Sequence, residues 1–75
     1  MSRVSMRESK AAALIKHIRQ SGCLTQKQFA DRIGVHKLTI TSYERGAKSP
    51  RIDKLQKIIE LAKEFGIVVN FYDFK

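Results

Sequence analysis

The fold is decided by residues 25–46, which read TQKQFADRIGVHKLTITSYERG. Thr25, followed three residues later by Gln28, is typical of a capping box, in which both side chains satisfy free N–H groups at a helix start. Gly34 can adopt the positive φ that ends this helix. A second helix is predicted over residues 37–45, and it is again followed by a glycine. Two short helices joined by a tight glycine turn predict a helix-turn-helix.

The two faces of the predicted helix at residues 37–45 differ in chemistry. Ile40 and Tyr43 form its apolar face, and Ala30 on the preceding helix leaves room for a close crossing. The opposite face offers donors, hydroxyl groups and two cations, without a carboxylate. A short helix with such a face fits the major groove of DNA. The residues of this face are Lys37, Leu38, Thr41, Ser42 and Arg45.

The size and charge of the chain agree with a nucleic-acid partner. The chain has 75 residues and a net charge of +8, with Lys and Arg spread over all segments. This charge favours a polyanionic partner, although a merely soluble basic surface explains the charge alone equally well. A single domain of this size is near the lower limit at which a core stabilises a monomer, so we expect it to gain from dimerisation.

The sequence does not support several other classes of function. No apolar run approaches the length of a membrane span, and the N-terminus lacks the apolar core of a secretory signal. His17 and His36 lie on different predicted elements, and no residue spacing suggests a metal site or a catalytic triad. The single Cys23 excludes an internal disulfide, and we expect it to pack as a small apolar residue rather than act as a redox switch. We therefore expect a cytoplasmic protein without enzyme activity, cofactor or metal.

A helix is predicted before the motif. Ser5 and Glu8 form a second capping box, which opens a helix that runs to about residue 21 and ends at Gly22. Residues 1–5 are expected to be flexible rather than to form an arm for the minor groove of DNA. The apolar residues of this helix that we expect in the core are Ala11, Leu14, Ile15 and Ile18.

A further helix is predicted after the motif, behind a basic loop at residues 47–51. Ser49 can cap this helix, Pro50 favours its first turn, and Gly66 ends it. The helix-turn-helix domain is therefore placed at residues 6–66. The residues of this helix that we expect in the core are Ile52, Leu55, Ile58, Ile59, Ala62 and Phe65.

Residues that match one known sequence pattern occur in order along most of the chain. They are Leu24-Thr25-Gln26, Ala30, Gly34-Val35, Ile40, Tyr43-Glu44-Arg45-Gly46 and Pro50. With these marks, the stretch from about Ala12 to Ile67 resembles the phage repressor/Cro-like helix-turn-helix family, also called the Xre family. The resemblance implies an all-α, lambda repressor-like domain of four helices that binds double-stranded DNA. It also implies an ion pair between Arg19 and Glu44, which ties the first helix to the reading helix.

The resemblance implies DNA contacts residue by residue. Lys37 is the best candidate for a contact to guanine, and Leu38 or Thr41 for a contact to a thymine methyl group. His36 stands where the family often has Ser or Thr. The base-reading positions of the family fall on His36, Lys37, Leu38, Thr41 and Ser42. The phosphate contacts of the family map to Thr25, Gln26, Thr39 and Arg51, to which the sequence adds Lys27 and Lys48.

The end of the chain departs from the common family pattern. Many relatives continue into a fifth helix, whereas residues 67–74 are β-branched and aromatic without a helical period. We expect one strand at residues 67–75, paired antiparallel with the same strand of a second copy, because a lone strand leaves its backbone groups unpaired. A loosely docked or disordered tail is the alternative. This arrangement resembles HipB-type antitoxins. The expected dimerisation residues are Val68, Val69, Phe71, Tyr72 and Phe74.

Two functions from different classes remain open. The first is a transcriptional repressor or autoregulator that binds as a homodimer to an inverted-repeat operator, with reading helices about 34 Å apart. The second is a HipB-like antitoxin whose main role is to bind and neutralise a toxin protein. The two functions are compatible, because antitoxins of this kind bind their own operator.

Overall fold

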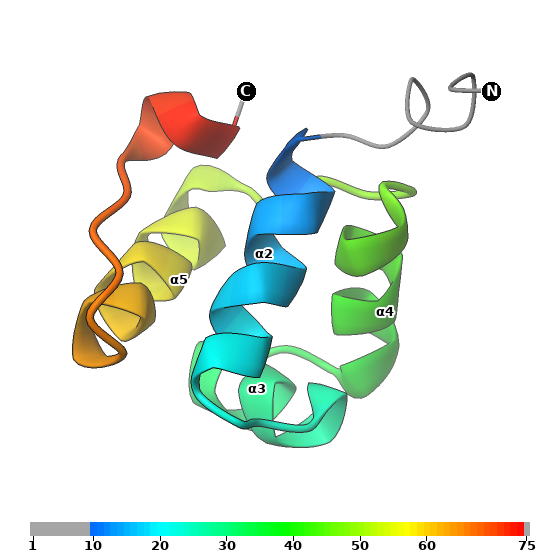
Figure 1. The fold of residues 1–75 in the computed structure, drawn as a ribbon. Helices are drawn as coiled ribbons and strands as arrows, with labels where there is room; N and C mark the ends of the chain where they lie inside the picture. Colours follow the sequence, from blue (N-terminus) through cyan, green and yellow to red (C-terminus); the bar gives the residue numbers. More distant parts are fainter. Residues whose placement is uncertain (1–9, 75) are drawn as a thin grey trace, which may run out of the picture.

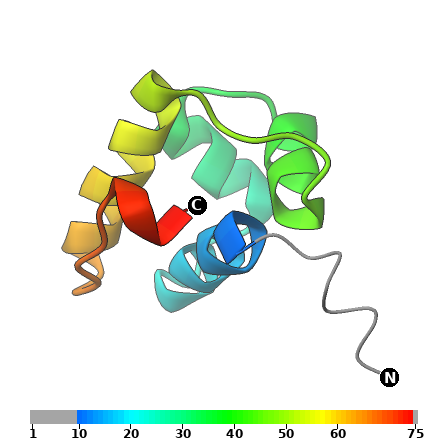
Figure 2. The same ribbon diagram turned by 90° about the horizontal axis from the view of Figure 1, so that it is seen from above.

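The structure is a computed structural model, and it describes residues 10–74. Figure 1 shows α2 between α5 and α4, with α3 crossing beneath them. Seen from above in Figure 2, the C-terminal 3-10 helix η1 lies beside the first turn of α2, and it packs against that helix. No helix within this range is long and apolar enough to cross a membrane. The elements are α2 (Lys10–Ser21), α3 (Gln26–Ile33), α4 (Lys37–Arg45), α5 (Ile52–Glu64) and η1 (Phe71–Phe74). The predicted Ser5–Glu8 capping box and the segment at residues 1–5 lie outside the described residues.

The predicted boundaries of the helix-turn-helix are confirmed. Gln28 N donates to Thr25 Oγ1 at 3.1 Å, and Thr25 N donates to Gln28 Oε1 at 2.9 Å, which completes the capping box of α3. Gly34 ends α3 with a φ of 87°, a value that a residue with a Cβ rarely adopts. Helix α4 spans the expected residues 37–45 and ends at Gly46. Local spacing was therefore sufficient to place both helices and the turn between them.

The turn after α2 differs from the prediction at two positions. Cys23, rather than a glycine, adopts the left-handed φ of 56°, and it is exposed, so the expectation that it packs inside was wrong. Its N–H donates to Gln20 O, and Leu24 N donates to Arg19 O, which are the two bonds of a Schellman motif. Gly22 is required for a different reason, because a Cβ at this position would lie 2.3 Å from Phe65 Cζ. The glycine therefore makes room for an aromatic ring.

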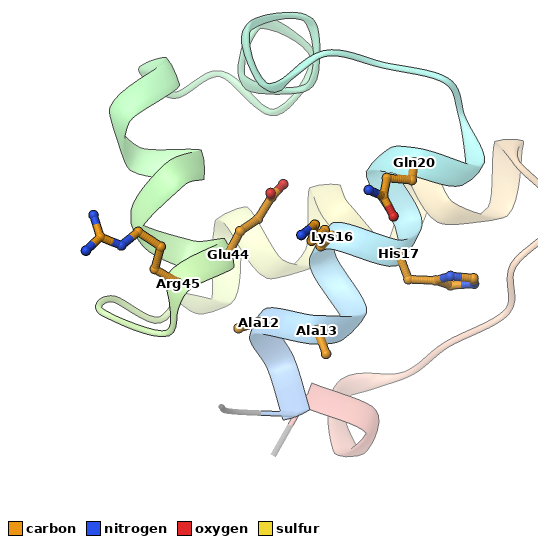
Figure 3. Close-up of a pocket in the computed structure, with 7 residues that line it drawn as sticks. All are labelled: Ala12, Ala13, Lys16, His17, Gln20, Glu44 and Arg45. Atoms are coloured by element: carbon orange, nitrogen blue, oxygen red, sulfur yellow. The ribbon is translucent and has the colours of Figure 1, made fainter. Parts of the chain in front are cut away.

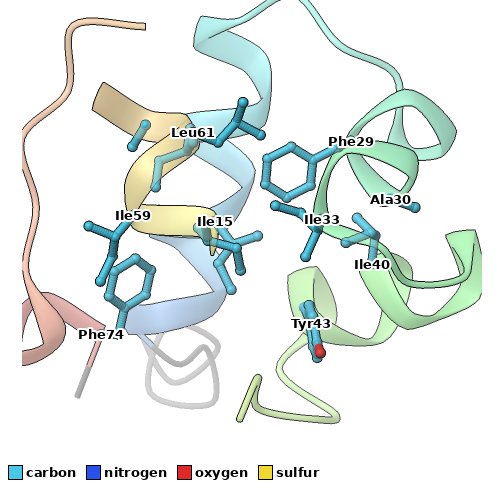
Figure 4. Close-up of a cluster of buried hydrophobic side chains, with 12 residues drawn as sticks. Ile15, Phe29, Ala30, Ile33, Ile40, Tyr43, Ile59, Leu61 and Phe74 are labelled. Carbon is cyan, nitrogen blue, oxygen red and sulfur yellow. The ribbon is translucent and has the colours of Figure 1, made fainter. Parts of the chain in front are cut away.

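The core joins the four α-helices and η1 of the described residues. Figure 4 shows the buried cluster extending from Phe74 and Ile59 on one side to Ile40 and Tyr43 on the other, with Ile15 between them. The residues that are completely or almost completely buried are Ile15, Ile18, Phe29, Ala30, Ile33, Ile40, Ile58 and Ala62.

The core residues predicted for the flanking helices are wrong in part, and the predicted Leu55 and Phe65 are only partly buried. On α2, Ala12 is buried, whereas Ala11 and Leu14 are only half-buried. On α5, Ile52 is 66% exposed, and Leu61 is buried although it was not predicted. Helix α5 also begins later than expected. Its N-cap is Arg51, whose side chain makes no capping hydrogen bond, so Ser49 is not the cap and Pro50 is not in the first turn. The N-cap lies two residues later than the predicted Ser49, which moves Ile52 to the exposed first position of the helix.

The predicted C-terminal strand is absent, and this part of the fold prediction was wrong. In the described chain, residues 67–70 have no regular structure and residues 71–74 form η1. Tyr72 N donates to Asn70 Oδ1 at 2.9 Å, and Asn70 N donates to Asp73 Oδ2 at 2.9 Å. These bonds fold residues 70–73 onto themselves, which replaces the extended backbone that a strand requires. The resemblance to HipB-type antitoxins in this region is therefore unsupported.

The five residues assigned to the strand have different environments. Phe74 is buried, and Val69 packs partly against the core. Val68 and Tyr72 are 86% and 78% exposed, and Phe71 is 39% exposed. Burial of Phe74 gives the tail an apolar anchor within its own chain, which β-propensity alone could not reveal.

Candidate nucleic-acid interface

Helix α4 presents a polar row to solvent, opposite its buried residues Ile40 and Tyr43. Lys37 and Arg45 are exposed, and Leu38 is 66% exposed, although its side chain is apolar. The two remaining residues of the row, at positions 41 and 42, are half-buried. The helix therefore offers a narrow surface of mixed chemistry, with cations at both ends and small hydroxyl groups between them.

His36 is the N-cap of α4. Its Nδ1 accepts a hydrogen bond from Leu38 N at 3.1 Å. In the neutral imidazole, Nε2 then carries the proton and acts as a donor. A side chain assigned to base reading therefore also caps the first turn of α4.

A largely buried ion pair fixes the position of α4 against α2. Arg19 Nε lies 2.6 Å from Glu44 Oε2, and Nη2 lies 3.1 Å from Oε1, so the contact is bidentate. The third guanidinium nitrogen donates to Leu24 O at 2.9 Å. The two side chains are only 14% and 6% exposed. Loss of either partner would leave a charge buried without compensation, which costs about 3–5 kcal/mol.

Gln26 and Thr41 extend this network to α3. Gln26 Nε2 donates to Glu44 Oε1 at 3.2 Å, and Thr41 Oγ1 donates to Gln26 Oε1 at 3.0 Å. Both residues were assigned to DNA contacts, yet their polar groups already join α3 to α4. Sequence reasoning missed this network because no rule of spacing relates positions 26, 41 and 44.

The residues assigned to phosphate contacts fall into two groups, one on each side of α4. Thr25, Gln26 and Lys27 lie at the start of α3, where Thr25 caps the helix and Lys27 Nζ lies 3.5 Å from Asp31 Oδ2. The second group lines one pocket beside the other flank of α4, and it includes Lys54, a cation that the sequence did not single out. The lining residues of this pocket are Thr39, Tyr43, Lys48, Ser49, Arg51, Asp53 and Lys54.

The hydroxyl group of Tyr43 adds a neutral polar atom to that pocket. Burial raises the pKa of Tyr43 above its ordinary value, and the carboxylate of Asp53 raises it further. The hydroxyl therefore stays protonated at neutral pH, where it can donate to an anion.

A second polar pocket lies between α2 and α4, and Figure 3 shows how its lining residues are directed. Glu44 extends into the space between the helices, whereas Arg45 extends away from α2 and His17 extends away from α4. The charged groups therefore do not converge on a common point. In the part of the chain that the structure describes, no three His, Cys, Asp or Glu residues lie close enough together to hold a metal ion.

Comparisons with known proteins agree with this geometry. The chain is 36% identical over 55 residues to the cryptic phage CTXphi transcriptional repressor RstR of Vibrio cholerae. The match covers 73% of this chain and 47% of that repressor, so the chain spans about half the length of its curated relative. Residues 15–67 match the helix-turn-helix family, and this range contains α3, α4 and α5. The chain belongs to the helix-turn-helix family.

Proposed function

We propose that the protein is a sequence-specific regulator of transcription that binds double-stranded DNA and represses by covering a promoter. The observation that carries this proposal is the polar row on α4, which a largely buried ion pair holds at the surface between Lys27 on one flank and the cations Lys48 and Arg51 on the other. Helix α4 lies in the major groove, and the two groups contact the phosphates on either side of it. The similarity to a phage transcriptional repressor supports the same function.

The environments of the α4 residues support specific roles. Lys37 donates to O6 and N7 of a guanine, and the exposed Leu38 contacts a thymine methyl group. The hydroxyl of Thr41 is already engaged by Gln26, so its methyl group is the part left for a base. Ser42 donates or accepts at a base edge, and Nε2 of His36 donates to a base or a phosphate.

The phosphate contacts give affinity without sequence preference. The expected contributors on one flank are Thr25, Gln26 and Lys27, and on the other Thr39, Lys48 and Arg51. Because each neutralised phosphate releases counterions, the affinity should fall by orders of magnitude over a modest rise in salt concentration.

We further propose that the protein acts as a homodimer on an inverted-repeat operator. One α4 helix reads only a few base pairs, and a two-fold axis doubles that length with half-sites about 34 Å apart. The alternative role as a HipB-like antitoxin depended on the C-terminal strand. Without that strand, no observation favours a toxin partner over DNA.

The test of this function compares two variants after a binding site has been selected from random DNA. Lys37→Ala combined with Ser42→Ala should weaken binding to the selected duplex and leave binding to a scrambled duplex nearly unchanged. One lost bidentate base contact reduces discrimination by about 1–3 kcal/mol. The control is Lys57→Ala, an exposed cation on α5. Unchanged selectivity in the double variant, with its fold verified by circular dichroism, would refute the assignment of α4.

A further inference from the structure

One side chain in the outward row of α4 is apolar. Leu38 is 66% exposed, whereas Ile40, two residues later, is completely buried. The N–H of Leu38, rather than its side chain, makes the capping contact with His36. A single exposed leucine is ordinary on a protein surface, so the groups beside Leu38 decide what it can bind.

The neighbour of Leu38 on this face is Thr41, because side chains three residues apart lie side by side on a helix. The hydroxyl of Thr41 donates to Gln26 Oε1 at 3.0 Å, and the carbonyl oxygen of Lys37 lies 3.3 Å from the same hydroxyl. A contact with the carbonyl one turn earlier selects between the two rotamers that threonine adopts in a helix. The hydroxyl is therefore engaged within the protein, and the methyl group of Thr41 is left for a ligand.

Gln26 determines the direction of that hydroxyl. The carboxylate of Glu44 can only accept hydrogen bonds, so the amide nitrogen of Gln26 faces it, at 3.2 Å. The amide oxygen of Gln26 then faces Thr41, which must act as the donor. Glu44 is itself fixed by its bidentate contact with Arg19. A chain of contacts therefore runs from the ion pair to Thr41, and each contact permits one orientation.

We propose that Leu38 and the methyl group of Thr41 together bind the C5 methyl group of a pyrimidine, and that Gln26 is the positioning residue of this site. We refer to Leu38 and Thr41 as the methyl-reading pair. Its use rests on the proposed function, because these side chains meet a base only when α4 lies in the major groove.

The chemistry of the methyl-reading pair defines its ligand as a methyl group rather than one base. Apolar groups recognise a methyl group by contact, and they do not read the donors and acceptors of a base edge. Thymine and 5-methylcytosine both carry a methyl group on C5, whereas uracil and cytosine lack it. The pair should therefore accept thymine or 5-methylcytosine, and the polar neighbours Lys37 and Ser42 are left to distinguish these two bases.

The first experiment measures affinity for the duplex selected from random DNA after each thymine of a half-site is replaced, one at a time, by deoxyuridine. At one position, the wild type should prefer thymine about fourfold, which corresponds to about 0.8 kcal/mol for one buried CH₂ group. With a C·G pair at that position, methylation of cytosine C5 should also raise the affinity about fourfold. A wild type that responds to no thymine, or that gains nothing from the methylated cytosine, overturns the inference.

Variants of the methyl-reading pair separate its methyl groups from the hydroxyl. Thr41→Ser keeps the hydroxyl and removes the methyl group, so the preference for thymine over uracil should fall to about twofold or less. Leu38→Ala should lower the same preference. Thr41→Val keeps a methyl group and should retain the wild-type preference. An unchanged preference in Thr41→Ser would contradict the assigned role of Thr41.

Gln26→Ala tests the positioning role. Without the amide, the hydroxyl of Thr41 loses its direction, and the preference for thymine over uracil should fall as it does in Thr41→Ser. Adding Thr41→Val should restore the preference, because valine needs no hydrogen bond to present a methyl group. A lost phosphate contact lowers the affinity for both duplexes alike, so the ratio isolates positioning. Wild-type preference in Gln26→Ala, or no recovery in the double variant, would refute this role.

The matched control is Lys27→Ala, which removes an exposed cation next to Gln26. This variant should bind every duplex more weakly and keep the wild-type preference for thymine over uracil. Circular dichroism verifies the fold of each variant.

The outcomes also separate this inference from the proposed function. A wild type that binds the selected and the scrambled duplex equally well refutes the proposed function, and the inference with it. A wild type that prefers the selected duplex but responds to no pyrimidine methyl group keeps the proposed function and overturns only the methyl-reading pair.

Discussion

Helix α4 and the C-terminal tail at residues 67–74 are held to the rest of the fold by different forces. Arg19 and Glu44 are 25 positions apart, and their bidentate contact links α2 to α4 with the help of Gln26. In the described part of the tail, the hydrogen bonds at residues 70–73 join only members of that segment. The tail attaches to the fold through apolar side chains, of which Phe74 is the most buried.

This difference agrees with the role proposed for α4. Directional polar contacts fix the position of α4, and a surface that reads base edges needs such precision. Apolar burial is not directional, and it holds the tail while leaving other apolar side chains of the same segment at the surface. The proposed reading surface is therefore positioned by directional contacts, whereas the described part of the tail is held mainly by apolar burial.

The largest effect should come from removing one aromatic anchor from each region. Phe29→Ala should lower the free energy of unfolding by about 3–5 kcal/mol, because Phe29 is completely buried and its loss leaves a cavity. Phe74→Ala should cost only about 1.5–3 kcal/mol, the burial energy alone, because the short η1 is attached mainly by apolar contacts and can shift to close the space. Chemical denaturation of both variants checks this order. Equal losses of unfolding free energy would mean that the tail is as tightly packed as the core. If Phe29→Ala does not fold, the comparison is repeated with Phe29→Leu and Phe74→Leu.

The next effect concerns the polar network. Glu44→Ala should lower the free energy of unfolding by about 3 kcal/mol or more, because it leaves Arg19 buried without its partner. Glu60→Ala is the control at an exposed position of α5, and it should change stability by less than about 0.5 kcal/mol. The melting midpoints of both variants are measured by thermal denaturation. Similar melting midpoints would rule out a stabilising role for the ion pair.

A smaller effect is expected where α5 meets the turn after α2. Gly22→Ala should cost about 1–3 kcal/mol, because the added methyl group would overlap the ring of Phe65. Replacing Phe65 by Leu in the same chain should relieve most of that loss, and a double-mutant cycle measures the coupling. If the two substitutions were additive, the close approach of Gly22 and Phe65 would not limit the packing.

The smallest effect is a change in pH dependence. The raised pKa of Tyr43 means that the folded state resists loss of the phenolic proton. This contribution is complete below about pH 10, the ordinary tyrosine value, and is lost as the pH rises through the pKa of the folded state. As the pH rises from about 9 to about 11, the free energy of unfolding of Tyr43→Phe should therefore fall less than that of the wild type. The exposed Tyr72, changed to Phe, is the matched control. Parallel curves for Tyr43→Phe and the wild type would contradict the assigned environment.

Local sequence rules predicted much of the helix-turn-helix and little of what surrounds it. The Thr25–Gln28 cap and the stop at Gly34 depend on neighbours in sequence, which is why spacing alone could place them. The contacts of Gln26 and Thr41 depend on how two helices cross, and no local rule contains that information. Cys23 was misplaced because the glycine beside it was taken as the helix stop.

The tail failed as a prediction for a related reason. Its β-branched residues suggested a strand, but the spacing of Asn70 and Asp73 is that of a reciprocal cap, and this local signal was overlooked. The buried position of Phe74 could not be predicted, because it depends on the tertiary contact between η1 and α2.

The central claim is that the outward row of α4 reads base edges. The most direct measurement is the ratio of affinities of the purified, folded protein for the best duplex selected from random DNA and for a scrambled duplex of equal composition. At physiological ionic strength, we predict a ratio of about 10³ or more and a selected site that is an inverted repeat. A ratio close to one would contradict the account.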